Sequence, residues 1–266
     1  MKFTKMQGTG NDYVYVNCFK ETVEDPEAAA ILVSDRHFGI GSDGLVLICP
    51  SDAADVKMRM FNMDGSEGIM CGNAIRCVGK YAYDHGLVSD TSITVETLGG
   101  IKVLEMETEG GKVVRVSVDM GVPEVTSRIP EPILVCGEEK EFVGISVGNP
   151  HAVYFCRDID SLKLEETGPY YENHSRFPGR VNSEFVQVVD RGHIRMRVWE
   201  RGSGETWACG TGATASAVAS ILRGYTDDRV IVSLRGGDLE ITWDRTGGHV
   251  FMKGPAVEVF CGEIHI

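Results

Sequence analysis

Met70-Cys71-Gly72-Asn73-Ala74 and Ala208-Cys209-Gly210-Thr211-Gly212 place a cysteine followed by glycine at two points of this chain, 138 positions apart (209 − 71). The same offset relates Gly10-Asn11 to Gly148-Asn149 and Arg59 to Arg197. It also relates Asn62 to Glu200 and Glu67 to Glu205. An offset that several segments share indicates an internal repeat, in which each copy is one structural unit. The sequence therefore predicts a duplicated fold with one Cys-Gly pair in each half.

Paired glycines extend this repeat toward the end of each half, with the offset slipped to 137. Gly99-Gly100 matches Gly236-Gly237, and Gly110-Gly111 matches Gly247-Gly248. Glycine pairs between alternating apolar runs predict hairpins. Each half is therefore expected to contain a three-stranded meander. The expected strands are 91–97, 101–107 and 113–119 in one half, and 229–234, 238–243 and 249–254 in the other.

A helix is expected before each meander. Residues 72–85 carry apolar side chains at helical spacing and end at Gly86, and residues 210–223 do the same and end at Gly224. The second segment is rich in small residues with few charges, which predicts a helix buried on nearly every side by the sheet of its own half. Pro26 predicts the start of a further helix, to about residue 37. Other expected strands are 12–17, 44–49, 56–62, 142–147, 151–156, 184–190 and 193–199.

These elements predict an α+β fold of two pseudo-symmetric repeats. Each repeat is expected to be a curved, mostly antiparallel sheet or barrel around a central helix, with the active site in the cleft between the repeats. The repeats are drawn at 1–118 and 119–254, because only Gly121, Pro123 and Pro130 mark a boundary between the halves.

Composition excludes several classes of function. A net charge of −13 and a pI near 5.0 argue against a nucleic-acid surface, which needs a basic stripe. No segment approaches the ~18 uninterrupted apolar residues of a membrane span, and no signal peptide is evident. The eight cysteines include no Cys-x-x-Cys motif, which indicates reduced thiols in the cytoplasm rather than a disulfide framework or a zinc site.

The two cysteines are the candidate catalytic groups. Cys71 and Cys209 each precede a predicted helix, whose unpaired N–H groups and positive potential are expected to lower the thiol pKa. The same N–H groups, contributed by Gly72, Asn73, Gly210 and Thr211, can hold a carboxylate. A single free cysteine is more often a small buried apolar residue. Two cysteines in repeated Cys-Gly frames favour the reactive interpretation.

Polar residues near the repeat positions form a second candidate set. Asn11, Asn62, Asn149 and Asn182 are each typical of turns or helix caps, but as a group they suit a zwitterionic ligand. Glu200 and Arg201 follow a predicted strand and offer one charge of each sign, although a solvated strand end is the simpler interpretation of the pair. His151 aligns with Tyr13 at the 138 offset and is expected near the same axis.

The motifs taken together resemble the diaminopimelate epimerase family. Asn62-Met63-Asp64-Gly65-Ser66 leading to Cys71-Gly72-Asn73-Ala74-Ile75-Arg76 resembles the family signature. Similar matches are Gly8-Thr9-Gly10-Asn11-Asp12, Gly148-Asn149-Pro150-His151, Glu200-Arg201-Gly202 and Ala208-Cys209-Gly210-Thr211-Gly212. The resemblance implies a homodimer without pyridoxal phosphate, metal or other cofactor. It also implies that a C-terminal strand, 255–266, returns to complete the first repeat.

The resemblance also implies a role for each matched residue. Cys71 and Cys209 would be the acid–base pair, with Cys209 the proton acceptor in one direction, and His151 and Glu200 would tune the thiols. Gly44 is a departure, because some relatives carry a side-chain amide there, and its binding role is weak. Phe260 stands where relatives have an interface tyrosine, so a hydroxyl bond across the dimer is not available. The implied substrate-binding residues are Asn11, Asn62, Gly72, Asn73, Asn149, Asn182, Glu200, Arg201, Gly210 and Thr211.

The sequence thus predicts a cofactor-independent epimerase that interconverts LL- and meso-diaminopimelate in lysine and peptidoglycan precursor synthesis. Its partner would be a small amino acid, with no nucleic acid and no membrane. A proline or hydroxyproline racemase is the alternative within the same superfamily. A thiol redox protein or zinc-binding protein is the alternative from another class, and a non-catalytic binding module is a third.

Overall fold

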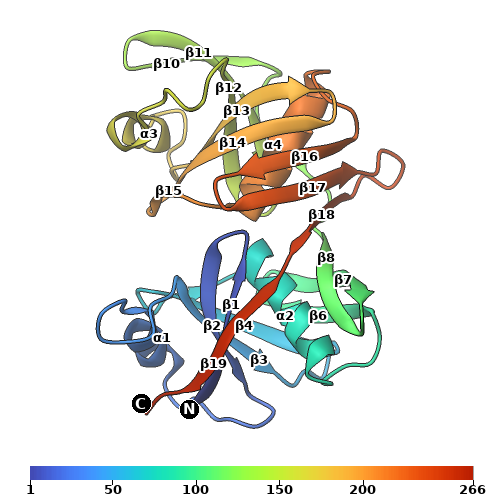
Figure 1. Ribbon diagram of the computed structural model, residues 1–266. Coiled ribbons are helices and arrows are strands. Elements are labelled where there is room, and N and C mark those ends of the chain that lie inside the picture. The colour runs from blue at the N-terminus through green and yellow to red at the C-terminus, as the bar shows by residue number, and fades with distance from the viewer. Residues whose placement is uncertain (266) are drawn as a thin grey trace. The chain divides into compact units, whose positions relative to one another are not determined.

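The computed structural model describes residues 1–265, so residue 266, at the end of the expected C-terminal strand, lies outside the described residues. The chain divides into two compact units, Met1–Val118 together with Lys253–Ile266, and Asp119–Met252. Each unit combines strands with two helices (Figure 1). The α+β fold class predicted from the sequence is confirmed.

The N-terminal unit is built from strands around helix α2. Its helices are α1 (Pro26–Ser34) and α2 (Gly72–Asp84), and α2 packs against β1, β2, β4, β6 and β7. The C-terminal strand β19 pairs antiparallel with β1, which ties the end of the chain to its beginning. The strands are β1 (Lys2–Gly8), β2 (Asn11–Asn17), β3 (Gly44–Cys49), β4 (Val56–Asn62), β5 (Glu67–Gly68), β6 (Ser92–Thr97), β7 (Gly100–Glu109), β8 (Lys112–Asp119) and β19 (Val257–Glu263).

The C-terminal unit has the same plan around helix α4. Its helices are α3 (Leu164–Glu172) and α4 (Gly210–Leu222), and α4 packs against β11, β12, β13, β14, β16 and β17. The strands are β9 (Glu124–Val125), β10 (Glu131–Val135), β11 (Glu138–Ser146), β12 (Pro150–Phe155), β13 (Asn182–Asp190), β14 (His193–Glu200), β15 (Gly204–Thr206), β16 (Arg229–Leu234), β17 (Gly237–Trp243) and β18 (Val250–Pro255), whose last residues belong to the other unit.

Strand pairing repeats from one unit to the other. β2 pairs parallel with β3 in the first unit, as β12 pairs parallel with β13 in the second. The parallel pairs β4–β6 and β14–β16 correspond in the same way. Side chains repeat too. Arg59 Nε donates to Glu67 Oε1 at 2.7 Å, and Arg197 Nε donates to Glu205 Oε1 at 2.8 Å, with a second NH2 bond to Oε2 in each pair. The internal repeat is therefore confirmed in backbone and side chains.

The two central helices start and end as the sequence predicts. Each begins directly after its cysteine, and each is followed by a glycine with positive φ, Gly86 at 69° and Gly224 at 70°. Residues 212–220 of α4 are all buried, mostly as Ala, Gly, Ser and Thr. Small side chains allow sheet and helix backbones to approach closely on every side of α4. The expectation of a helix enclosed by its own sheet is confirmed.

Other boundaries differ from the sequence predictions. α1 ends at Ser34 rather than near residue 37, because the Asp35 carboxylate accepts hydrogen bonds from the amides of His37 and Phe38 and turns the chain. The periodic patterns did not indicate β1, β10 or α3. α3 is short and contains Pro169, which hides its helical character in the sequence. These elements form through tertiary contacts, such as the β1–β19 ladder.

The packing around α4 can be tested at Ala217, which is fully buried. Replacing Ala217 by Leu should reduce the free energy of unfolding by about 1–3 kcal/mol, since the enclosed site has no room for extra methylenes. Urea denaturation followed by circular dichroism measures this. The matched control is Ala28→Leu on the exposed side of α1, which should change the free energy by less than about 0.5 kcal/mol. Equal effects at the two positions would contradict the enclosed packing.

Candidate active site

Cys71 lies at the N-cap of α2, where the backbone is still extended (φ −131°, ψ 119°). The Cys71 carbonyl oxygen accepts a hydrogen bond from Ile75 N at 2.9 Å, which is the first hydrogen bond of the helix. The N–H groups of the first turn have no acceptor within the helix. The half-buried thiol donates to Asn11 Oδ1 at 3.4 Å. The sequence placed this cysteine at a helix start, and the structure confirms it.

Asn11 connects Cys71 to the first turn of α2. Its Oδ1 also accepts from Asn73 Nδ2 at 3.4 Å, and its own Nδ2 donates to Asp43 Oδ2 at 2.7 Å. Thr9 Oγ1 donates to Asn73 Oδ1 at 3.3 Å. Four of the expected residues, Asn11, Cys71, Gly72 and Asn73, therefore meet at one helix N-terminus.

Gly44 and Asn62 are paired across β3 and β4. A Cβ added to Gly44 would lie 2.0 Å from the Phe61 carbonyl oxygen, so this position accommodates no side chain. Gly44 therefore contributes only backbone to this region. Asn62 organises the following turn, because its amide N–H donates to Ser66 O at 2.9 Å and its Nδ2 donates to Ser66 Oγ at 3.0 Å.

Cys209 lies at the N-cap of α4 in the same extended conformation (φ −123°, ψ 109°). Its sulfur accepts from Gly212 N at 3.4 Å and lies 3.5 Å from Thr211 Oγ1. The Thr211 hydroxyl in turn accepts from Asn149 Nδ2 at 3.3 Å. Asn149 and Thr211 thus repeat the arrangement of Asn11 and Asn73 in the other unit.

His151 is held between two oxygen acceptors in the C-terminal unit. Its Nδ1 lies 2.7 Å from Glu184 Oε1, and its Nε2 lies 2.9 Å from Asn149 Oδ1. Both His151 and Glu184 are essentially inaccessible to solvent. A Cβ added to Gly212 would lie 2.8 Å from Glu184 Oε1, so the carboxylate packs directly on the helix start.

Glu200, Asn182 and Arg201 surround the end of β14. Thr206 Oγ1 donates to Glu200 Oε1, and Asn182 Oδ1 accepts from Arg201 N at 2.8 Å. The exposed Arg201 guanidinium donates from NH1 to Gly179 O at 3.2 Å. Burial raises the pKa of the Glu200 carboxyl, while hydrogen bonds from Thr206 and Cys209 lower it.

The expectation of a lowered thiol pKa is wrong for Cys209. Burial raises the pKa of this thiol well above its ordinary value, and the charges of Glu200 and Glu184 raise it further. Bonds from Thr211 and Gly212 act in the opposite direction but are smaller causes. The reason is that a helix N-terminus stabilises a thiolate only modestly, whereas enclosure and two neighbouring carboxylates disfavour its charge.

Sequence reasoning missed three residues of this region. Glu184 is a fully buried carboxylate in β13, within a run of five buried residues, and a lone carboxylate in an expected strand gave no signal of its burial. Tyr13 contacts Asn11 and Cys71, and burial raises the pKa of its hydroxyl. Arg76 is fully buried and donates to Gly72 O at 3.1 Å and to Thr9 Oγ1 at 3.3 Å. The helical spacing of α2 gave a signal for Arg76, because an arginine four residues after Gly72 lies over the same helix face.

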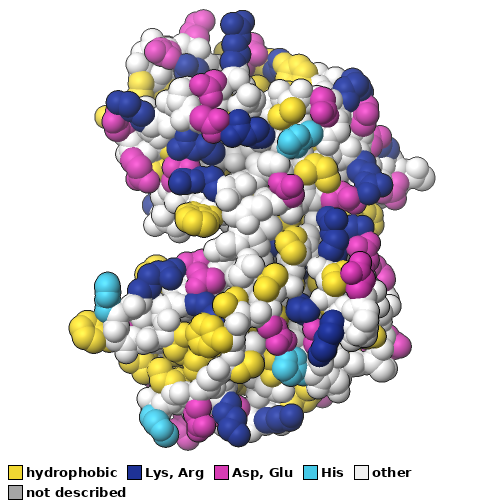
Figure 2. All heavy atoms as spheres, viewed as in Figure 1, with side chains coloured by type: hydrophobic (Ala, Val, Ile, Leu, Met, Phe, Trp, Pro, Cys, Tyr) yellow, Lys and Arg dark blue, Asp and Glu magenta, His cyan; other side chains and the backbone are white. Residues whose placement is uncertain are grey.

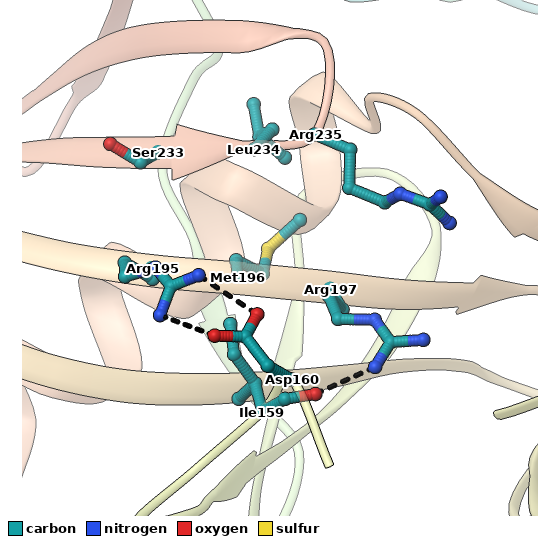
Figure 3. Close-up of a pocket in the computed structure, with 8 residues that line it drawn as sticks. All are labelled: Ile159, Asp160, Arg195, Met196, Arg197, Ser233, Leu234 and Arg235. Carbon is teal, nitrogen blue, oxygen red and sulfur yellow. Dashed lines mark hydrogen bonds and ion pairs between the residues drawn. The ribbon is translucent and has the colours of Figure 1, made fainter. Parts of the chain in front are cut away.

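A separate cavity of about 340 Å³ lies in the C-terminal unit (Figure 3). Three arginines line it, but each is already paired with a carboxylate. Arg195 forms two bonds to Asp160, at 2.9 and 3.0 Å, and Arg235 lies 3.1 Å from Glu205, which also holds Arg197. The cavity contains none of the expected site residues. Its lining is Ile159, Asp160, Arg195, Met196, Arg197, Ser233, Leu234 and Arg235.

Among residues 1–265, no three His, Cys, Asp or Glu side chains gather in a way that could hold a metal ion. In that same part of the chain, no helix is long and apolar enough to cross a membrane.

Solved structures with similar architecture define the fold class of this protein. A phenazine biosynthesis protein of the PhzF family from Bacillus anthracis superposes with a TM-score of 0.77 at 17% identity, covering 100% of this chain and 99% of that one. A probable proline racemase from Agrobacterium radiobacter gives 0.76 at 15% identity, covering 100% and 93%. At these identities the likeness shows the fold alone. The chain has the two-unit fold of PhzF-type proteins and proline racemases.

Sequence relatives then specify the family. A model of the family described as diaminopimelate epimerase matches residues 3–126 and 143–259. Diaminopimelate epimerase from Acetivibrio thermocellus is 56% identical over 100% of this chain and 99% of its own length. The enzyme of that name from Methanococcus maripaludis is 53% identical over 100% of both chains. The chain belongs to the diaminopimelate epimerase family.

The electrostatic control of Cys209 can be tested with Glu200→Gln. Removing the Glu200 charge should lower the pH at which Cys209 is alkylated by iodoacetamide, since a neutral amide no longer repels the thiolate. Alkylation rates across a pH series, read by peptide mass spectrometry, measure the shift. Glu166→Gln, at an exposed carboxylate of the same unit, is the control and should leave the profile unchanged. A profile that is unchanged or moves upward in Glu200→Gln would contradict this account.

Proposed function

We propose that this protein interconverts LL- and meso-diaminopimelate without a cofactor, using Cys71 and Cys209 as a proton-transfer pair. The names of its close relatives support the substrate. The observation that carries the mechanism is the repeated half-site: each unit has a cysteine at the N-cap of its central helix, with an asparagine at the helix start beside it. A symmetric pair of thiols suits a reaction that exchanges the two faces of one carbon.

In the proposed reaction, one cysteine as thiolate removes the α-proton and the other as thiol delivers a proton to the opposite face. The C–H bond electrons move into the carboxylate, and after protonation the configuration of the carbon is inverted. The first cysteine ends as thiol and the second as thiolate, so protons and charge balance. The proposal requires that the two units bring the sulfurs to opposite faces of the substrate carbon.

The helix starts supply the electrostatic stabilisation. The amides of Gly72, Asn73, Gly210 and Thr211 belong to the first turns of α2 and α4, where intrahelical acceptors are missing. A carboxylate bound by these amides can accept the negative charge that develops as the α-proton leaves. Glycine directly after each cysteine lets the carboxylate approach the backbone closely.

The remaining polar residues would bind the far end of diaminopimelate, which carries its own ammonium and carboxylate groups. We assign the distal carboxylate to Arg201 and the amide of Asn62, and the ammonium groups to Glu200 and the carbonyl oxygens of Asn11, Asn149 and Asn182. Arg201 is exposed and therefore accessible to a ligand. Proline has no second carboxylate, so this set favours diaminopimelate over the racemase alternative.

His151 and Glu200 would set the protonation state of the pair. In the free C-terminal unit the raised pKa of Cys209 keeps that sulfur protonated. Two cysteines on opposite faces of one substrate would hold one proton between them. Their apparent pKa values would then describe the pair and not either cysteine alone. We propose that Cys71 is then the thiolate that begins turnover in one direction, and that the roles exchange in the reverse direction.

Replacing either Cys71 or Cys209 by Ala should abolish epimerisation, because one face of the carbon then has no proton carrier. Proton NMR of LL-diaminopimelate in D2O, with proline in a parallel sample, measures α-proton exchange and substrate choice together. Cys136→Ala, at an exposed thiol, is the control and should retain wild-type exchange.

More than a few per cent of wild-type turnover in either active-site variant would contradict the two-thiol mechanism. Exchange on proline alone would favour the racemase, and none on either substrate would favour a redox or binding role.

We further propose that the protein is a cytoplasmic homodimer that pairs through the surface around β19. Figure 2 shows hydrophobic side chains gathered over this strand and its surroundings in the N-terminal unit. Val257, Val259 and Phe260 are 41%, 56% and 49% exposed, which is unusual for three apolar residues on one short strand. Phe260 packs edge-on against Phe3, with ring centroids 5.9 Å apart, so its ring is held in place at the surface.

Phe260→Asp should convert a dimer to a monomer, because a charge at the centre of an apolar contact must be desolvated. Sedimentation equilibrium measures the mass, and circular dichroism checks that the variant is folded. Phe38→Asp, at a ring that is 89% exposed on the loop after α1, is the control and should leave the mass unchanged. A folded Phe260→Asp protein that stays dimeric would show that the interface lies elsewhere, and a monomeric wild type would refute the dimer.

A further inference from the structure

Two cysteines outside the proposed active site lie side by side at the ends of parallel strands. β2 and β3 pair in register up to Asn17 and Ile48. The Cys18 amide continues this ladder, donating to Ile48 O at 2.8 Å. Cys18 and Cys49 therefore occupy the next paired position of the two strands. Both residues are half-buried, so small reagents can reach them.

The strand geometry brings the two thiols within bonding range. Paired residues of neighbouring strands point to the same face, and neighbouring strands lie about 4.8 Å apart. Disulfides join residues whose Cα atoms are about 4.4–6.8 Å apart. Each thiol is the largest influence on the pKa of the other, raising that of Cys18 and lowering that of Cys49, as expected for side chains on the same face of paired strands.

The interaction between the two thiols is the largest influence on both pKa values, and burial and neighbouring charges add to it. Arg59 lowers the pKa of both, and Lys57 lowers that of Cys49. Glu21 acts in the opposite direction on Cys18, as Glu67 does on Cys49. Lys57 pairs with Cys49 across β3 and β4, so a cation stands beside this thiol. Since the thiolate is the reactive form, Cys49 is the better attacking group, and Cys18 is the thiol that resolves the mixed disulfide.

The internal repeat supplies a natural comparison for this pair. In the C-terminal unit Cys156 N donates to Val186 O at 2.8 Å, the same ladder bond that Cys18 makes in the first unit. The next paired position after Phe155 and Val186 is Cys156 with Gln187. The second unit thus has the same backbone arrangement with one thiol and one amide, and burial raises the pKa of Cys156.

We propose that Cys18 and Cys49 form a redox-active dithiol, which a small-molecule disulfide converts to an intrachain disulfide. The Cys49 thiolate attacks one sulfur of the small disulfide, whose S–S bond breaks and releases one thiolate. Cys18 then loses its proton and attacks the Cys49 sulfur of the mixed disulfide, which releases the second small thiolate. The protein loses two electrons and two protons, and the small disulfide gains them.

The position of this pair separates it from the proposed reaction. Cys18 follows the C-terminal end of β2 and Cys49 is the last residue of β3, whereas Asn11 and Gly44 begin these strands. The disulfide closes the loop from residue 18 to residue 49, which contains α1 and Asp43. Because the pair lies at the opposite ends of these strands from Asn11 and Gly44, its oxidation should leave turnover unchanged. The cross-link restricts the unfolded chain, so oxidation should raise the midpoint of thermal unfolding by several degrees.

The test is incubation of the full chain with oxidised glutathione, followed by peptide mapping without reduction. We expect a cross-linked pair of peptides containing Cys18 and Cys49, and a cross-link that dithiothreitol removes. Cys156 should carry at most a single glutathione. Glutathione on Cys18 and Cys49 separately, or both thiols free under conditions that add glutathione to exposed Cys136, would overturn the proposal.

Single variants test the order of the two steps. Cys18→Ser should accumulate a glutathione adduct on Cys49, because the resolving thiol is missing. Cys49→Ser should react at Cys18 at least several-fold more slowly than Cys18→Ser reacts at Cys49, because Lys57, which pairs with residue 49 across β3 and β4, stabilises a thiolate at Cys49. Faster reaction at Cys18 would contradict the assigned order.

Gln187→Cys supplies a gain-of-function variant in the matched position. It should gain a disulfide to Cys156 if the strand register is what creates the dithiol. No cross-link in a folded Gln187→Cys protein would contradict that geometric argument.

The stability effect is measured by differential scanning calorimetry of oxidised and reduced samples. The wild-type midpoint should rise on oxidation, and the Cys18→Ser/Cys49→Ser double variant should show no rise. Turnover of the double variant, treated and untreated, reports separately on any oxidation of Cys71 and Cys209. An equal rise in the double variant would show that this pair does not carry the stabilisation.

Discussion

Enclosure of a helix by the sheet of its own unit is the constraint on which the rest of this structure depends. A helix with apolar contacts on every side has no solvated face, so its backbone must lie close to the surrounding strands. The close approach of helix and strand backbones requires small buried residues, such as Ala213 and Ala217 in α4 and Gly79 in α2. An enclosed helix also has a fixed N-terminus. The residue that precedes it is therefore held in one position, and in both units that residue is a cysteine.

The same enclosure explains why the helix dipole alone does not set the pKa of Cys209. A helix N-terminus favours a thiolate, but a buried thiol with carboxylates beside it is held in the neutral form. In the C-terminal unit the second effect prevails, since Glu200 and the buried Glu184 both act on Cys209. Glu184 is itself held by His151, whose Nδ1 lies 2.7 Å from Glu184 Oε1. The acid–base behaviour of the site thus comes from residues that the cysteine motif does not contain.

The two units of the repeat retain some side-chain pairs and carry different residues at other matched positions. The Arg59–Glu67 and Arg197–Glu205 pairs are retained with nearly equal distances, because both brace a strand end that leads to a cysteine. Other positions have diverged: Tyr13 corresponds to His151, and Asn62 corresponds to Glu200. The half-sites are alike in backbone but different in charge. Such a difference suits two groups that must hold different protonation states at the same moment.

The sequence by itself determined the repeat, the central helices, most strands and the position of a cysteine directly before each central helix. Each of these leaves a local trace, either a shared offset, a glycine after a helix, or an alternating run. The sequence did not determine β1, α3, the burial of Glu184 or the direction of the Cys209 pKa shift. Those depend on which segments pack together, as β1 does with β19 and Glu184 with His151. Only the tertiary structure decides them, because burial and the distance between charges are properties of residues far apart in the chain.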